Sequence, residues 1–117
     1  MTIKRIGIGP RMSAAVVHGH TVYLAGQVAD KTAGGSVGQQ TAEILAIIDS
    51  LLKQAGTDKT NLLSATIYLP DISTFAEMNG EWDKWVAPGH TPARATVEAK
   101  LAAAKYAVEI ACIAAIP

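Results

Sequence analysis

The sequence predicts an α+β domain in which two amphipathic helices lie on one face of a single sheet. Two segments repeat apolar residues at helical spacing, while the other apolar segments are short or alternate with polar residues as strands do. Their order is β-β-β-α-β-α-β-β, and no linker or low-complexity stretch interrupts it. A chain of 117 residues can build one ordinary hydrophobic core, so we expect residues 1–117 to form one domain.

Three strands are predicted before the first helix. The segment "IKRIGI" (3–8) alternates in polarity. The segments "AAVVHG" (14–19) and "TVYLAGQVA" (21–29) follow, and their junction at Gly19 and His20 predicts a hairpin. The next piece, "DKTAGGS" (30–36), is rich in Gly and therefore predicts a loop.

The first helix is marked at both ends. Ser36 and Gln39 have the spacing of a capping box, in which each side chain binds the other residue's backbone N–H. Gly56 is placed to end the helix in the left-handed conformation. The apolar face of this helix comprises Ile44, Leu45, Ile48, Leu51, Leu52 and Ala55.

The second half of the chain predicts a strand, a helix and two further strands. The strand "NLLSATIYLPD" (61–71) is stopped by Pro70, and Asp71 is a suitable N-cap for the helix. "ARATVEAKL" (93–101) and "YAVEIACIAA" (106–115) are joined by a short connection, which predicts that they pair as an antiparallel hairpin. The apolar stripe of the second helix comprises Ile72, Phe75, Met78, Trp82 and Trp85.

The face of the sheet away from the helices is also expected to be apolar. The segments "TVYLAGQVA", "LSATIYL" and "VEIACIAA" carry apolar residues at nearly all positions. A monomer would expose that face to water, and we therefore predict a homo-oligomer that buries sheet against sheet.

Composition excludes several classes of function. Ten basic and ten acidic residues balance, whereas nucleic-acid-binding proteins usually carry a basic excess, so we expect no nucleic-acid partner. No apolar stretch approaches the ~18 residues of a membrane span, and the start of the chain has no signal-peptide pattern. The one cysteine, Cys112, lies in an apolar run and predicts a buried free thiol. These features predict a cytoplasmic protein.

Metal and phosphate chemistry lack the residues they need. His18, His20 and His90 are the only histidines, and with one cysteine they give no spacing typical of a zinc site. No glycine-rich phosphate motif is present. We therefore predict no metal.

Arg94 and Glu109 remain as candidates for chemistry. Arg94 interrupts an apolar strand, and its planar fork can bind a carboxylate through two hydrogen bonds. Glu109 could balance that charge or hold a water molecule against a substrate. An ordinary cross-strand ion pair is the simpler interpretation, and the residue types alone favour it. Gly26, at the end of a strand, could let a small ligand approach the backbone closely.

The combination of four blocks resembles the Rid family, the reactive intermediate deaminases that are also called the YjgF family. The resemblance runs from about Gly9 to Ala114. It implies a chorismate-mutase-like fold with a single mixed sheet, assembled as a homotrimer with ligand clefts between subunits. The blocks are "VYLAGQVA", "QQTAEILAIIDSLLKQAG", "ATIYLPDISTFAEMNGEWDKW" and "PARATVEAKL" with "VEIACIA".

The resemblance also implies a reaction. It is the hydrolysis of enamine and imine acids, such as 2-aminoacrylate, to 2-oxo acids and ammonia, as in a 2-iminobutanoate/2-iminopropanoate deaminase. The role is metabolite damage control, and no cofactor is needed. By position, Arg94 would hold the substrate carboxylate and Glu109 would lie near the attacking water. The backbone of Gly26 and the side chain of Asn79 would line the cleft.

Several positions depart from the pattern of better-known members, among them Ala14 in place of a glutamine. Met12 stands where a pocket tyrosine is common, Ala25 lacks a hydroxyl, and Thr96 replaces a frequent cysteine. The resemblance therefore indicates a divergent subfamily that retains the substrate-binding arginine. Loss of these polar groups leaves an alternative open, in which the same intersubunit cleft binds a small carboxylate metabolite as a non-catalytic sensor.

Overall fold

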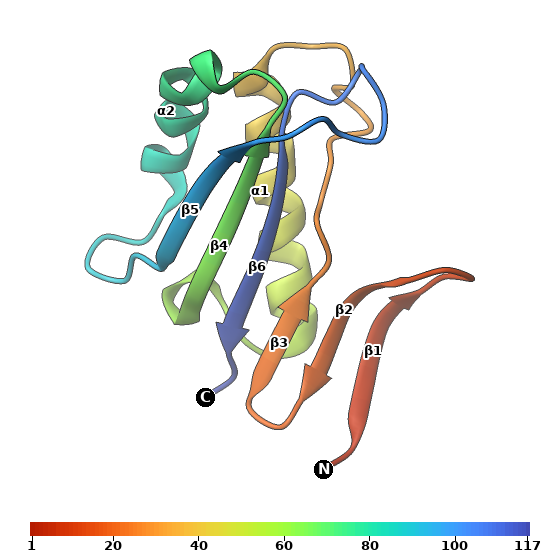
Figure 1. Cartoon of the computed structure of the whole chain (residues 1–117). Coiled ribbons are helices and arrows are strands. Elements are labelled where there is room, and N and C mark those ends of the chain that lie inside the picture. Colours follow the sequence, from red (N-terminus) through yellow and green to blue (C-terminus); the bar gives the residue numbers. More distant parts are fainter.

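A computed structural model describes all residues, 1–117, and contains one six-stranded sheet and two α-helices (Figure 1). The predicted order β-β-β-α-β-α-β-β is confirmed. Short 3₁₀ turns at Lys59–Asn61 and Ile72–Thr74 precede β4 and α2. The elements are β1 (Ile3–Ile8), β2 (Ser13–His18), β3 (Thr21–Leu24), α1 (Val37–Ala55), β4 (Leu62–Leu69), α2 (Phe75–Trp85), β5 (Ala93–Glu98) and β6 (Glu109–Ala115).

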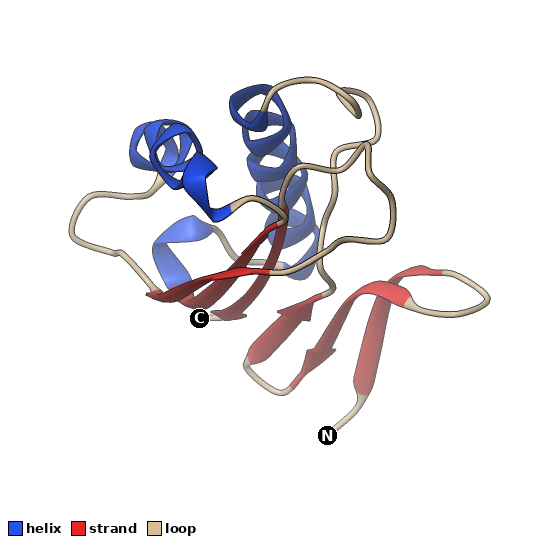
Figure 2. Cartoon of the chain, turned by 45° about the horizontal axis from the view of Figure 1, so that its top comes forward, coloured by secondary structure: helices blue, strands red, loops and turns tan.

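Both helices lie on the same face of the sheet, as predicted (Figure 2). The core fills the space between them and the strands. Ile44, Ile48 and Leu52 of α1 are fully buried, as are Ile67 and Leu69 of β4. Spacings of three and four residues place the α1 side chains in one stripe, and alternate residues of β4 point to the same face of the sheet. We call this side of the sheet the helix-covered face and the other side the open face.

The strand order is β1-β2-β3-β6-β4-β5, so β4 lies between β5 and β6. The predicted hairpin of the last two strands is therefore wrong. Helix α2 connects β4 to β5 and returns the chain to the same end of the sheet, so β5 runs parallel to β4. The connection from β5 to β6, residues 99–108, is long enough to pass β4, and β6 pairs antiparallel with β4 on its other side.

The ends of α1 form as the sequence predicts. The Ser36 hydroxyl accepts a hydrogen bond from the Gln39 N–H, and the Gln39 side chain accepts one from the Ser36 N–H, both at 3.1 Å. Gly56 ends the helix with φ 88°, a left-handed conformation that costs glycine little. The Gly19 turn of the β2–β3 hairpin has φ 61° and is confirmed as well.

Helix α2 differs from its prediction. Asp71 caps the 3₁₀ turn, where its side chain accepts the Ser73 N–H at 3.0 Å, and α2 proper begins at Phe75. Of the predicted apolar stripe only Met78 and Trp82 are buried, whereas Ile72 and Phe75 remain 41% and 42% exposed. Helix α2 packs chiefly against α1, and its N-terminal Phe75 lies beside Arg94 instead of in the core.

The open face carries apolar side chains that no other element of the chain covers. Tyr23 on β3 and Val97 on β5 are 47% and 41% exposed. Val16, Tyr68 and Ile113 lie on the same face and are half-buried. This agrees with the expected second apolar face. No helix in the structure has the length and apolar character to span a membrane.

Candidate functional site

Arg94 projects from the edge strand β5 into a cradle formed by α2. It pairs with the buried Ala65 of β4, so its side chain lies on the helix-covered face. Its Nη1 donates a hydrogen bond to Asn79 Oδ1 at 2.8 Å. Its Cζ lies 5.8 Å from the centre of the Phe75 ring and 5.2 Å from that of Trp82. The spacing of residues 75, 79 and 82 places all three on one side of α2.

The charge of Arg94 has no counterion in the chain. The only ion pair joins Lys84 to Glu81, at 3.3 Å. The flanking rings attract a cation through their electron-rich faces, yet leave the guanidinium's hydrogen-bonding edge open. Of the five N–H donors of an arginine, one hydrogen bond goes to the protein, through Asn79. A half-buried, oriented cation with unused donors can bind an anion.

Two contacts hold α2 in place around Arg94. The Glu77 carboxylate accepts the Gly38 N–H at 2.7 Å, at the N-terminus of α1, where a negative charge is favourable. The Glu98 carboxylate accepts the Ile72 N–H at 3.1 Å and so ties β5 to the 3₁₀ turn before α2. The cradle is thus fixed to both α1 and the sheet.

Glu109 and Gly26 meet on the open face. Glu109 pairs with Tyr68 of β4 and points away from the helices. Its carboxylate packs so closely on Gly26 that a Cβ atom there would collide with Oε2. Backbone hydrogen bonds between Gln27 and Ile110, at 2.8 and 3.1 Å, hold the two segments together. The close approach expected at Gly26 therefore exists, and the group that approaches is Glu109.

Arg94 and Glu109 of one chain do not pair, so the cross-strand ion-pair interpretation is wrong. Their partners on β4, Ala65 and Tyr68, are three residues apart, roughly 10 Å along the strand, and face opposite sides of the sheet. The Glu109 carboxylate makes no hydrogen bond or ion pair within the chain. Each of the two candidates is thus left without a charged partner, on its own face.

The other predicted site residues divide between these two groups. Thr96 is two residues after Arg94 on the same face of β5, and its hydroxyl is buried without a hydrogen-bond partner. Ala25 precedes Gly26, and its N–H donates to Ala14 O at 2.9 Å. Met12 is in the β1–β2 connection, is 59% exposed, and lies at the opposite end of the strand order from Arg94.

Sequence reasoning missed three contributors. Phe75 and Trp82 were expected to be core residues, and they flank Arg94; their spacing with Asn79 was the available signal. The third is Gln40, which is fully buried on α1. Its side chain donates to Gly35 O and Lys105 O at 3.1 and 3.0 Å. It also accepts the Ala107 N–H at 2.8 Å, and it thereby fixes the loop that leads to Glu109. A polar residue beside an apolar helical stripe was the signal for it.

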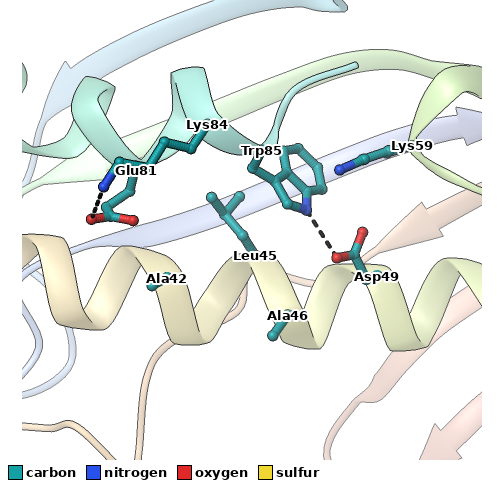
Figure 3. Close-up of a pocket in the computed structure, with 8 residues that line it drawn as sticks. All are labelled: Ala42, Leu45, Ala46, Asp49, Lys59, Glu81, Lys84 and Trp85. Atoms are coloured by element: carbon teal, nitrogen blue, oxygen red, sulfur yellow. Dashed lines mark hydrogen bonds and ion pairs between the residues drawn. The ribbon is translucent and has the colours of Figure 1, made fainter.

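The hollows of the single chain lie elsewhere. A groove of about 260 Å³ between α1 and α2 contains Trp85, whose Nε1 donates to Asp49 Oδ2 at 3.0 Å, and the Lys84–Glu81 pair (Figure 3). Two more hollows, of about 340 and 160 Å³, lie beside Pro70 and Tyr106. None is lined by Arg94 or Glu109, so a single chain does not enclose either group.

Neither a metal centre nor a thiol nucleophile is found. No three His, Cys, Asp or Glu side chains are grouped so that they could hold a metal ion. Cys112 is a buried free thiol, as predicted, and burial raises its pKa to about 12. A thiol that stays protonated is a poor nucleophile.

Comparison with known proteins agrees with the resemblance seen in the sequence. A family model described as "Endoribonuclease L-PSP" matches residues 2–116. A RutC family protein from Haemophilus influenzae is 45% identical over 114 residues, covering 97% of this chain and 98% of that protein. A 2-iminobutanoate/2-iminopropanoate deaminase from Bos taurus is 35% identical over 112 residues, covering 92% of this chain and 80% of that enzyme.

The fold gives the same result. A crystal structure of a YjgF family member from Neisseria meningitidis matches with a TM-score of 0.96 and 45% identity, covering 100% of this chain and 97% of that one. The family match extends over nearly the entire chain, and the sheet order and both helices belong to the matched region. The chain belongs to the YjgF/Rid family, which also contains the RutC family proteins.

Proposed function

We propose that this protein hydrolyses small enamine and imine acids of the 2-aminoacrylate type to 2-oxo acids and ammonia. The observation that carries the proposal is Arg94: an oriented, half-buried guanidinium without a counterion suits the carboxylate of such a substrate. The Bos taurus relative, whose name states this class of reaction, supports the same assignment.

The chemistry asks little of the protein beyond orientation. An enamine acid tautomerises to the imine, whose protonated nitrogen makes the imine carbon electrophilic. Water adds to that carbon while Glu109 takes one of its protons, which forms a carbinolamine. The proton then passes from Glu109 to the amine nitrogen, and the C–N bond breaks. Glu109 takes the hydroxyl proton as the C=O bond of the 2-oxo acid forms, and that proton leaves with ammonia as ammonium. Arg94 holds the carboxylate next to the reacting carbon, a proximity effect.

The proposed site is shared between two copies of the chain. Arg94 and Glu109 of one chain lie on opposite faces of the sheet, so one ligand can meet both only if they come from different chains. The open face, with Tyr23, Val97 and Ile113, is the apolar surface that a neighbouring copy would cover. We infer a homotrimer in which sheets pack around the axis and Arg94 faces the neighbour's Glu109.

A second candidate function is binding without turnover, in which the cleft senses a small carboxylate metabolite. It is favoured by the departures at positions 12 and 25, because Met12 and Ala25 offer no polar group where better-known members carry one. Both functions require Arg94, and they differ in whether imine is consumed.

The test is ammonia release from imines that an amino-acid oxidase generates in place. Catalytic amounts of the wild type should accelerate release, whereas Arg94→Ala should leave it at the uncatalysed rate and Arg94→Lys should restore little, because lysine lacks the planar fork. Equal rates for wild type and Arg94→Ala would reject the proposal. Binding of 2-oxobutanoate without acceleration would support the sensor instead.

The description of the family model names an endoribonuclease, so RNA cleavage needs its own control. The chain has zero net charge and no basic run, which speaks against RNA as its substrate. RNA cleavage that rises with purity and survives Arg94→Ala would assign the activity to another surface.

A further inference from the structure

Two adjacent residues of α1, Gln40 and Thr41, bury polar side chains completely. The Thr41 hydroxyl donates within its own helix, at 2.7 Å. The Gln40 amide bonds outside the helix: Nε2 donates to Gly35 O and Lys105 O, at 3.1 and 3.0 Å, and Oε1 accepts the Ala107 N–H at 2.8 Å. Gln40 therefore joins two segments, one just before α1 and one just before β6.

An amide is the side chain that this set of contacts requires. The two carbonyl groups need donors and the Ala107 N–H needs an acceptor, and a glutamine carries both. An ionised glutamate has no donor and would place an oxygen against the carbonyls. A leucine would remove all three hydrogen bonds, and water could not replace them because position 40 has no exposed surface. The two segments thus depend on this one side chain.

The joined segments are the two loops that hold Glu109 against Gly26. Gly26 lies in the β3–α1 loop, residues 25–36, and Glu109 directly follows the β5–β6 loop, residues 99–108. The Glu109 carboxylate packs on Gly26. Because Gln40 bonds to both loops, the place of that carboxylate depends on it.

The sheet alone fixes only one side of Glu109. The ladder between β4 and β6 includes Glu109, whereas the regular pairing of β3 with β6 stops at Tyr23. Towards Gly26, only the isolated bridge between Gln27 and Ile110 continues that pairing. Beyond the bridge, contacts between the loops and the buried amide take over from the sheet.

We propose that Gln40 is a positioning residue for imine hydrolysis: it joins the two loops and so holds the Glu109 carboxylate where it takes a proton from the attacking water. This rests on the proposed function, which gives Glu109 that role. Gln40 is fully buried, so it acts through Glu109 and not on the substrate. Arg94 is oriented by α2, so binding of the substrate carboxylate does not depend on Gln40. A reacting group displaced by about 1 Å can lose about 100-fold in rate.

The experiment compares two adjacent substitutions, Gln40→Leu and Thr41→Val. Each removes a buried hydrogen-bonding group from α1 without a large change in size, but only the first frees the loops. For Gln40→Leu we expect kcat for imine hydrolysis to fall at least about tenfold, while the Kd and stoichiometry of 2-oxobutanoate binding, from calorimetry, change less than about twofold. Thr41→Val should keep kcat and Kd within about twofold of the wild type.

Hydrogen exchange tests the loop contacts without any substrate. The Ala107 N–H should exchange at least about tenfold faster in Gln40→Leu than in the wild type, and at the wild-type rate in Thr41→Val. If Gln40→Leu does not fold, Tyr106→Phe takes its place, because the Tyr106 hydroxyl donates to Asp30 and is a second tie between the same loops. That variant should lower kcat by a smaller factor and leave Kd unchanged.

Two results would overturn the proposal. Unchanged kcat in Gln40→Leu, or in Tyr106→Phe where it stands in, would show that the loops do not position Glu109. Binding of 2-oxobutanoate that weakens in proportion to kcat would show a general structural defect. The proposed function fails separately: if the wild type does not hydrolyse imines, that function is rejected, and exchange of the Ala107 N–H decides whether Gln40 holds the loops. If the wild type is active and Gln40→Leu matches it, only the role of Gln40 fails.

Discussion

The two faces of the sheet are built in different ways, although both carry candidate site residues. On the helix-covered face, the chain itself surrounds Arg94 with Phe75, Asn79 and Trp82. On the open face, Glu109 has its Gly26 contact and no hydrogen-bond partner, and apolar side chains around it remain uncovered. The difference teaches that one chain alone orients the proposed anion-binding group, whereas in the proposed mechanism Glu109 meets the substrate only through a second copy.

The largest expected effect comes from a charge on the open face. Ile113 lies there on β6, next to Tyr23 of β3. Ile113→Asp should convert the proposed trimer into monomers, because a carboxylate cannot be buried unpaired between sheets. Imine hydrolysis should fall to background even though the Arg94 cradle is intact. Light scattering after size exclusion gives the mass. Ala46→Asp, at an exposed position of α1 beside the α1–α2 groove, is the matched control. A fully active Ile113→Asp monomer would refute the shared site.

A smaller effect is expected inside the cradle. Asn79→Asp puts a carboxylate beside Arg94 with almost no change of shape, so it supplies the counterion that the receptor lacks. Binding of 2-oxobutanoate should weaken by roughly 2 kcal/mol, or about thirtyfold. Asn79→Ala, which only frees Nη1, should weaken it less. Calorimetry decides, and equal affinities for Asn79→Asp and the wild type would mean that Arg94 does not receive the anion.

The smallest effect concerns Cys112, which is on the helix-covered face and 2% exposed. Because its pKa is raised to about 12, the native thiol should resist iodoacetamide at pH 8.5 and react only after unfolding. The unfolded thiol ionises near pH ~8.5, so this residue lowers the free energy of unfolding as pH rises from there towards 12. Rapid labelling of the native protein would contradict the dry packing of this face.

The predictable parts of the fold are the local ones. Ser36, Gln39 and Gly56 determine the ends of α1 through contacts within a few residues, and the sequence shows them directly. The pairing of β5 depends on which way the chain turns after α2, and a short connection on to β6 suggested the wrong partner. Sheet order is a global outcome that local patterns do not determine.

The sequence singled out residues that the structure brings together in two groups, but it did not predict that the groups lie apart. Arg94, Asn79 and Thr96 do share one face, and Gly26 and Glu109 do meet. The separation of Arg94 from Glu109 follows from the position of β4 between their strands. Phe75 shows a second limit, because an apolar side chain at helical spacing gives the same pattern whether it covers a core or a guanidinium.

The most direct test of the central claim, that each site takes Arg94 from one chain and Glu109 from another, is complementation between two inactive variants. Arg94→Ala and Glu109→Gln are purified separately, mixed in equal amounts under conditions that allow subunit exchange, and assayed for ammonia release from imines. A shared site predicts that about a quarter of all sites regain both residues after full exchange, one in each trimer that holds both variants, and that activity returns. Activity that stays at the level of the separate variants, with exchange verified by mass, would contradict the claim.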